Sequence, residues 1–454
     1  MVKTSFGFLS GIKNLVLAIG LLLFSVQTIQ SMDIQTGQLI SDDEIEHTLV
    51  GWLEQIFKVA QIKMQPKVLI LADPEVNAGA TLGELIIVYT GLILKCQNVN
   101  QLLGVLAHEA GHIAGAHSAR AADAQKQAMI PAVATMLLSG AAALAAGSSE
   151  PLVAGLMGGA QVFERGLLKH SRDQEETADS AALKYLNQLK WPTTGLYEFL
   201  NLLDSNYTGH IDPYTSTHPL SKERKEKVRL FQKEKNDSVQ SLPDQEKQFQ
   251  RIKAKIKGFM DKPQNVLREY KASDKEIGPR YGRAIGLYRS GKLSESLETL
   301  NNLLKEFPQD PFFLELKGQV LFETGQVTEA AVYLRQALKY CPNAQVIPLL
   351  LAQALLEKPD QGDSQDLKEP IHLLKQVLER SPENVFGWRL LARAYGKNNQ
   401  MDLMALCLAE EAFLMKNFPL AKAQAEKAQK SQDPFVSKRA ADILSQITLD
   451  QVKG

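Results

Sequence analysis

The sequence predicts a mostly α-helical protein with a small β-sheet, in which an α+β domain precedes an all-α solenoid. Apolar residues recur at helical spacing in most segments, including residues 42–63 and 99–120. Two short β-branched runs, at residues 67–72 and 85–89, predict the strands. In the last third of the chain, small residues and prolines repeat every 34 residues, which predicts a stack of similar helical pairs.

The composition is that of a globular protein long enough for two or three domains. Of the 454 residues, 44% are hydrophobic, and 51 basic side chains balance 51 acidic ones. Because there is no basic excess, nucleic acid is not an expected partner. The chain has three cysteines, so a disulfide between Cys341 and Cys407 and three free buried thiols both remain open.

The N-terminal residues have the pattern of a secretory signal peptide. Lys3 and Lys13 precede an apolar run at residues 15–24, and a polar exit follows. The run is shorter than the roughly 20 residues that a membrane span needs. We therefore expect residues 1–31 to be removed on export, with a retained membrane anchor as the alternative.

Residues 129–163 form a predicted hydrophobic hairpin. No charged residue occurs between positions 129 and 149, and residues 151–163 are apolar again after a short polar turn. The abundance of glycine and alanine favours close helix packing. We expect the hairpin to pack on the N-terminal domain or to touch a membrane surface, because its second arm is too short to cross a bilayer.

The last third of the chain has the period of a tetratricopeptide array. Two glycines and two prolines recur 34 residues apart: Gly291, Gly325, Pro308 and Pro342. Each unit of such an array is a pair of helices, and stacked units form a solenoid that can dock other proteins. We expect this repeat domain over residues 273–450, and a charged helical linker over residues 231–272 before it.

The segment His108-Glu109-Ala110-Gly111-His112 predicts a metal site on a helix. A spacing of four places both histidines on one helix face, where their imidazoles can bind one metal ion. The glutamate is one step round the helix and can reach a water in the open metal position. Because the motif supplies only two protein ligands, a third is required.

Glu175 and Asp179, about 60 residues downstream, are the candidates for completing the site. They are four apart and share a helix face. One carboxylate can bind zinc while the other accepts the N–H of a ligand histidine. Glu176 points about 100° away around the helix. These residues predict a zinc metallopeptidase domain over residues 32–230, with one Zn²⁺ per chain.

The pattern H-E-x-G-H followed by E-x-x-A-D resembles the gluzincin peptidases related to HtpX and the prenyl-protein peptidases. The resemblance implies a gluzincin zinc-peptidase domain of α+β fold that cleaves internal peptide bonds. It assigns His108, His112 and Glu175 as metal ligands, Glu109 as the catalytic base, and Asp179 as a proton donor. We favour a different role for Asp179, the orientation of a ligand histidine.

The segment from Thr217 to Arg224 is similar to the H-P-x-x-x-x-R segment of the same family. The resemblance implies that His218 fills the fourth zinc position and keeps the enzyme inactive, because an imidazole there displaces the nucleophilic water. A surface histidine before a turn proline is the alternative. Arg224 could anchor this loop or stabilise charge, and the sequence does not decide between the two.

The expected signal peptide and the expected repeat domain resemble those of the exported, repeat-bearing branch of this family. That branch implies a periplasmic endopeptidase that degrades misfolded, stalled or unassembled outer-membrane proteins and could also aid their assembly. The repeat domain would dock on the outer-membrane barrel-assembly machinery. Two alternatives remain: a chaperone-like repeat scaffold with a largely silent peptidase domain, and a membrane-embedded peptidase. We expect an extended substrate to pair beside residues 86–89.

Overall fold

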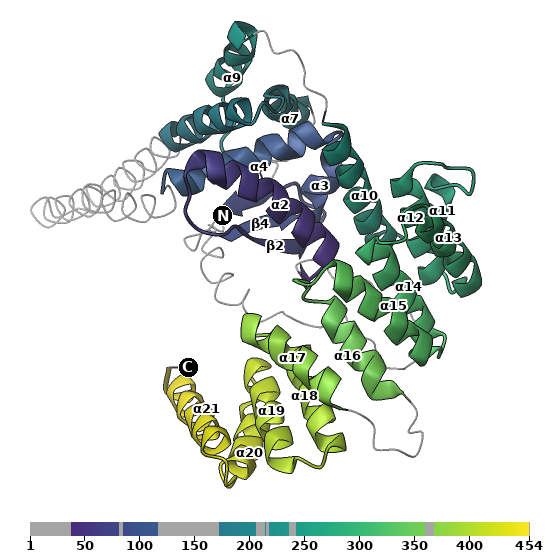
Figure 1. The fold of residues 1–454 in the computed structure, drawn as a ribbon. Coiled ribbons are helices and arrows are strands. Elements are labelled where there is room, and N and C mark those ends of the chain that lie inside the picture. The colour runs from purple at the N-terminus through teal and green to yellow at the C-terminus, as the bar shows by residue number, and fades with distance from the viewer. Residues whose placement is uncertain are drawn as a thin grey trace, which may run out of the picture. The chain divides into compact units, whose positions relative to one another are not determined.

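The computed structural model describes most of the chain (Figure 1). The described residues are 38–80, 85–116, 172–205, 214, 218–235, 242–358 and 367–453. The expected signal peptide at residues 1–31 and the hydrophobic hairpin at residues 129–163 lie outside the described residues. The chain divides into two compact units, which we call the mixed unit and the helical unit. They are Ile45–Lys253 and Met1–Glu44 with Ala254–Gly454, respectively.

The division between the units falls inside α10 (Pro243–Met260), which lies in the segment expected as a linker. The linker stays a prediction, and in the described part of this segment apolar side chains are buried on both sides of the division. Phe249 is buried in the mixed unit, and Ile256 of the same helix is buried in the helical unit. The next helix, α11 (Pro263–Glu269), likewise buries Val266. The described residues of this segment therefore bury apolar side chains in each unit.

The sheet of the mixed unit has β4 (Leu85–Tyr89) in its middle. β2 (Lys67–Ala72) pairs with β4 in parallel, and β3 (Ala78–Ala80) pairs with its other edge in antiparallel orientation. The expectation that a substrate pairs beside residues 86–89 is therefore wrong, because both edges of β4 are occupied. Since β3 consists of alanine and glycine, it has none of the β-branched residues that signal a strand.

Several helices complete the mixed unit. They are residues 45–60 of α2 (Asp43–Ala60), α3 (Thr90–Lys95), α4 (Val99–Ala114), residues 172–188, α7 (Thr194–Ser205) and α9 (Lys222–Lys235). The side chain of Asn98 caps α4 by accepting the N–H of Gln101 at 3.1 Å. α4 ends before the predicted residue 120, because Ala116 takes a left-handed conformation with a φ of 49°.

The helical unit is a run of helices in which each packs on the next along the chain (Figure 1). After β1 (Gln38–Ile40) and α11, they are α12 (Ile277–Arg289), α13 (Leu293–Glu306), α14 (Pro311–Glu323), α15 (Val327–Tyr340), α16 (Ile347–Glu357), α17 (Lys368–Arg380), α18 (Val385–Lys397), α19 (Met401–Leu414), α20 (Phe418–Ala428) and α21 (Pro434–Lys453). α12 and α14 begin 34 residues apart, and so do α13 and α15. Gly291 and Gly325 occupy the equivalent turns with φ of 76° and 78°, which glycine adopts without strain.

The predicted fold class is confirmed, since an α+β unit with a small sheet is joined to a solenoid of helical pairs. The identification of these pairs as tetratricopeptide repeats stays a prediction. All three cysteines are described, and Cys96, Cys341 and Cys407 are free and buried. The disulfide between Cys341 and Cys407 is therefore not formed. Among the described helices, none is long and apolar enough to cross a membrane.

The first turn of α2 belongs to the helical unit and caps one of its helices. The carboxylate of Asp43 accepts the N–H groups of Gln345, Val346 and Ile347, at 2.5, 2.9 and 2.9 Å. These residues begin α16, whose own N-cap residue, Val346, provides no side-chain cap. Asp43 therefore accepts the N–H groups that have no partner within α16 itself, at a helix start 304 residues further along the chain.

The residues on either side of Asp43 join a buried ion cluster around Lys255. The Lys255 Nζ lies 2.8 Å from Asp42 Oδ2, 3.1 Å from Glu44 Oε2 and 4.0 Å from Glu315 Oε2. Burial raises the pKa of Glu315, Lys255 opposes this effect, and the neighbouring carboxylates reinforce it, so the pKa reaches about 8. The cluster therefore holds a carboxyl group that stays protonated near neutral pH.

We predict that Asp43→Ala lowers the stability of the helical unit by about 1–3 kcal/mol, because three N–H groups at the start of α16, all at least partly buried, lose their acceptor. Urea unfolding followed by circular dichroism measures the shift in the transition midpoint. Glu298→Ala, at an exposed position on α13, serves as the control and should change the midpoint little. Equal midpoints for the Asp43 variant and the wild type would contradict the capping role.

We also predict that Glu315 makes the helical unit less stable as the pH rises. In the unfolded chain this carboxyl loses its proton near pH 4.5, whereas in the fold it keeps the proton up to about pH 8. Between these values the unfolded state binds fewer protons, so the free energy of unfolding falls with increasing pH. Melting temperatures between pH 5 and 8 should therefore decline less steeply for Glu315→Gln than for the wild type. Parallel declines would show that the carboxyl does not titrate in this window.

Candidate metal centre

α4 carries the first part of the site. His108 and His112 are one turn apart on this helix, and their Nε2 atoms lie 3.0 Å apart. Every residue of α4 from Gln101 to His112 is buried. The packing of a helix buried on all sides fixes its rotation, so both imidazoles have a defined direction.

The helix at residues 172–188 brings Glu175 to the two histidines. Its Oε2 lies 3.3 Å from Nε2 of His108, and its Oε1 lies 3.2 Å from Nε2 of His112. The two helices approach this closely because Gly111 faces Ala178. A Cβ atom at Gly111 would lie 2.8 Å from the carbonyl oxygen of Ala178. The close contact between Gly111 and Ala178 therefore positions the carboxylate of Glu175 beside the histidines.

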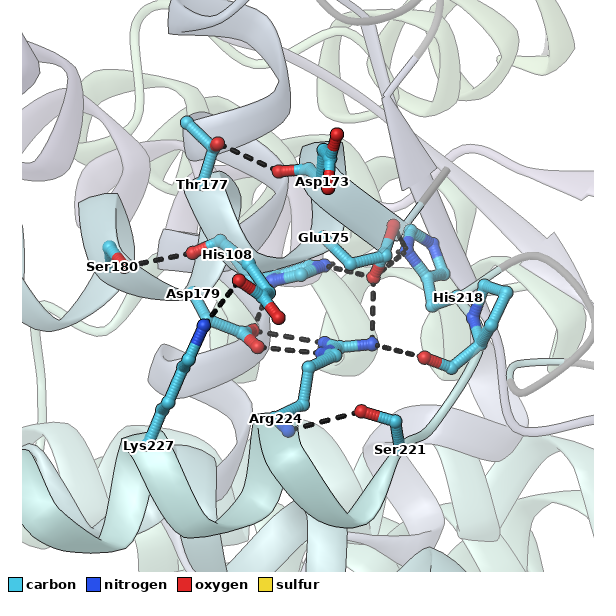
Figure 2. Close-up of polar contacts among 12 residues, drawn as sticks. His108, Asp173, Glu175, Thr177, Asp179, Ser180, His218, Ser221, Arg224 and Lys227 are labelled. Atoms are coloured by element: carbon cyan, nitrogen blue, oxygen red, sulfur yellow. Dashed lines mark hydrogen bonds and ion pairs between the residues drawn. The ribbon is translucent and has the colours of Figure 1, made fainter. Parts of the chain in front are cut away.

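A third segment of the chain supplies His218 (Figure 2). Its Nδ1 lies 3.1 Å from Glu175 Oε1 and 3.4 Å from His108 Nε2. The potential ligand atoms of His108, His112, Glu175 and His218 all lie within 4.8 Å of one another, and all four side chains are buried. The fold thus gathers four donors that span 110 residues of sequence.

The spacing of these donors fits a divalent metal ion. Three imidazole nitrogens and a carboxylate are ligands that zinc commonly takes. A tetrahedral ion with bonds of about 2.0–2.1 Å separates its ligand atoms by about 3.3 Å. The five separations given above, which use both oxygens of Glu175, run from 3.0 to 3.4 Å and are close to this value.

The charges at the centre also favour a cation. Burial lowers the pKa of His108, but the carboxylates of Asp179 and Glu175 outweigh burial and raise this pKa to about 10. Burial raises the pKa of Glu175, but three surrounding histidines hold it well below its ordinary value. A divalent cation would take the place of the proton that His108 binds so tightly.

Asp179 and Arg224 lie behind this centre (Figure 2). Asp179 Oδ1 lies 2.9 Å from Nδ1 of His108, the ring nitrogen that does not face the other donors. Arg224 donates from Nε and Nη2 to the two Asp179 oxygens, at 2.6 and 2.9 Å, and its Nη1 lies 2.9 Å from Glu175 Oε2. Burial raises the pKa of Asp179, but His108 and Arg224 hold it below its ordinary value. Asp179 is therefore an ionised carboxylate that can accept the N–H of His108.

Glu109 lies between the donors and β3. Its Oε2 accepts the N–H of Ala80 at 3.0 Å, and its Oε1 lies 3.6 Å from Nε2 of His218. The side chain is fully buried. In the part of the sheet that the structure describes, β3 is an end strand. The carboxylate is thus placed between the donor cluster and the edge of the sheet.

Tyr214 belongs to the site although the sequence motifs do not include it. Its ring stacks on the imidazole of His218, with centroids 4.6 Å apart and 26° between the planes. Its backbone carbonyl accepts the N–H of His218 at 2.7 Å. The signal in the sequence is its position four residues before His218.

We predict that Gly111→Ala weakens metal binding about 10-fold or more, because the new Cβ forces the two helices apart and draws Glu175 away from the histidines. Competition with a chromogenic zinc chelator measures the affinity. Gly51→Ala is the matched control, since a Cβ added at this α2 glycine would meet nothing within 4 Å. Unchanged affinity in the Gly111 variant would contradict the proposed geometry.

The residues described above fall inside a recognised sequence family. Residues 46–231 match Peptidase family M48. The Beta-barrel assembly-enhancing protease of Escherichia coli (strain K12) is 27% identical over 352 residues, which cover 75% of this chain and 69% of that protein. The Putative beta-barrel assembly-enhancing protease of Vibrio cholerae serotype O1 is 25% identical over 379 residues, covering 80% of this chain and 74% of that protein.

A third relative matches over a shorter length. Metalloprotease YcaL of Escherichia coli (strain K12) is 31% identical over 156 residues, or 34% of this chain and 58% of that protein. The family match begins before α4 and ends beyond Arg224, so it includes all the side chains gathered at the metal centre. Residues 46–231 are therefore similar to peptidase family M48, and the chain is a metalloendopeptidase.

Proposed function

We propose that the chain is a zinc-dependent endopeptidase that acts in the periplasm on misfolded or stalled outer-membrane proteins. The observation that carries the proposal is the convergence of His108, His112 and Glu175 beside the buried carboxylate of Glu109. Two histidines and a glutamate with an adjacent carboxylate form the donor set of hydrolytic zinc centres. A single Zn²⁺ held by these ligands would acidify a water molecule and polarise a peptide carbonyl.

Glu109 is the proposed general base. Its carboxylate accepts the proton of the attacking water and passes it to the departing amine. The hydrogen bond from Ala80 N–H holds one oxygen, so the other faces the donor cluster. Because Ala80 lies in β3, the same strand orients the base and borders the position of a substrate that pairs with the sheet.

Asp179 is the proposed orienting residue for His108. An ionised carboxylate at Nδ1 fixes the proton on that nitrogen and leaves the Nε2 lone pair free for the metal. Arg224 donates two hydrogen bonds to this carboxylate and keeps it charged, which argues against a proton-donor role for Asp179. Arg224 also donates to the carbonyl of Pro219 at 3.0 Å, so we assign it as the anchor of the His218 loop.

His218 is the proposed autoinhibitory plug. The distances of its Nδ1 from Glu175 Oε1, 3.1 Å, and from His108 Nε2, 3.4 Å, support a role as the fourth ligand. An imidazole there excludes the water that would attack a peptide bond. We therefore propose that the arrangement described here is the inactive form, and that activity requires His218 to leave the centre.

The biological setting of the proposal is supported by two relatives whose names describe enhanced β-barrel assembly. We propose that the helical unit docks on the outer-membrane barrel-assembly machinery, since solenoids of helical pairs present extended binding surfaces. The signal peptide at residues 1–31 would provide export to the periplasm. Membrane contact through residues 129–163, and a membrane-embedded peptidase built on them, stay predictions about residues outside the described part of the chain.

A chaperone-like scaffold with a largely silent peptidase is the second candidate. The observation that favours it is the position of His218, which closes the centre. Complementation of a strain that lacks this protein separates the two functions. If Glu109→Gln restores outer-membrane assembly as well as the wild type does, the scaffold is the main function. If Glu109→Gln does not restore outer-membrane assembly, peptidase activity is the main function.

We predict that Glu109→Gln keeps its metal but loses at least about 100-fold in cleavage rate, because the amide cannot accept the proton of water. The measurement uses the purified protein with an unfolded outer-membrane β-barrel protein as substrate, together with metal content. Glu176→Gln is the control, since this neighbouring carboxylate forms an exposed ion pair with Lys227. Undiminished cleavage by the Glu109 variant would refute the assignment.

A further inference from the structure

We infer that Tyr214 is a positioning residue that holds the imidazole of His218 in the fourth position of the metal centre. The inference rests on the proposed function, since it requires His218 to be a ligand of the bound ion. It goes further by identifying the residue that orients the imidazole of His218. The argument depends on which movements of His218 are restrained and which would be free without Tyr214.

The backbone is restrained on both sides of His218. On the N-terminal side, its N–H donates to the carbonyl of Tyr214 at 2.7 Å. On the C-terminal side, Arg224 donates to the carbonyl of Pro219 at 3.0 Å, and the same guanidinium is bonded to Asp179. A residue that precedes proline also has a restricted backbone. These contacts place the Cα and Cβ atoms of His218, but they do not set the plane of its ring.

The plane of the ring decides whether a nitrogen lone pair points at the metal. The lone pair of a histidine lies in the ring plane, and rotation about its terminal side-chain torsion is soft. Tyr214 covers one face of the His218 ring in a stacked arrangement, with 26° between the planes. The rings of His108 and His112 meet His218 at 72° and 62°, so they converge on it rather than stack. The stack with Tyr214 therefore restrains the rotation.

Tyr214 is itself fixed to the core that carries the other ligands. It is 1% exposed, and its ring packs edge-on against Phe199 of α7, with centroids 5.2 Å apart. α7 lies tightly against α4, since a Cβ at Gly195 would lie 2.0 Å from the carbonyl oxygen of Asn100. The helix that bears His108 and the Tyr214 ring that stacks on His218 thus belong to the same hydrophobic core.

If residue 214 only filled space in the core, any large apolar side chain would serve. If it orients the ring of His218, a flat aromatic side chain is required. Aromatic pairs in favourable geometry shift a population ratio by about 2- to 12-fold beyond the effect of burial. We therefore expect the ring of Tyr214 to raise the ratio of ligated to unligated His218 by a factor in this range. The stack itself needs only the aromatic ring and not the hydroxyl group.

The test uses the full-length protein loaded with Co²⁺, whose visible absorption reports the number and kind of its ligands. His218→Ala provides the reference spectrum for a centre in which solvent replaces the imidazole. Tyr214→Leu should shift the wild-type spectrum towards this reference, while Tyr214→Phe, which keeps the ring, should leave it unchanged. Tyr214→Met is the second apolar variant and should match Tyr214→Leu if both fold, which circular dichroism checks.

A second readout is the rate at which 1,10-phenanthroline removes the metal. This rate should rise about 2- to 12-fold in the leucine and methionine variants and stay at the wild-type value in the phenylalanine variant. If His218→Ala changes the spectrum but the folded leucine and methionine variants keep the wild-type spectrum and rate, the inference is overturned. If the wild type binds no Co²⁺, or His218→Ala leaves the spectrum unchanged, the proposed centre or its plug fails instead, and the inference fails with it.

Discussion

The close crossing of α4 with the helix at residues 172–188 is the constraint on which the site depends. Gly111 and Ala178 let the two backbones approach, so that Glu175 reaches both histidines of α4. The same crossing places Asp179 behind His108. A bulkier side chain at the contact would separate the carboxylates from the imidazoles. The chemistry of the centre is therefore a consequence of helix packing as much as of the donor residues themselves.

The buried charges around this crossing stabilise one another only as a set. Isolated buried carboxylates are costly, but each of the two here has cationic or hydrogen-bonding neighbours. Arg224 contacts both Glu175 and Asp179, and it also holds the backbone beside His218. Removal of one member would leave buried charge without its partner. This interdependence explains why the proposed metal ligands, the proposed orienting carboxylate and the proposed loop anchor occur together in so small a volume.

The sequence could predict what depends on local periodicity. Residues four apart on a helix share a face, so the donor pairs of both helices and the 34-residue helical pairs could be inferred from spacing alone. Contacts between distant segments left no such signal, as the two hydrogen bonds from Arg224 to Asp179 show. The capping of α16 by Asp43 was hidden for the same reason. The expectation that a substrate pairs beside β4 was wrong because β3 already occupies that edge. The alanine and glycine residues of β3 do not predict a strand from the sequence.

The central claim is that one zinc ion binds three histidines and one glutamate drawn from three segments of the chain. X-ray absorption at the zinc edge tests this most directly, on full-length protein loaded with one equivalent of Zn²⁺. The account predicts four nitrogen or oxygen neighbours at about 2.0 Å, with outer-shell scattering from three imidazoles. Scattering from only two imidazoles would contradict the role of His218, and failure to retain zinc would contradict the centre as a whole.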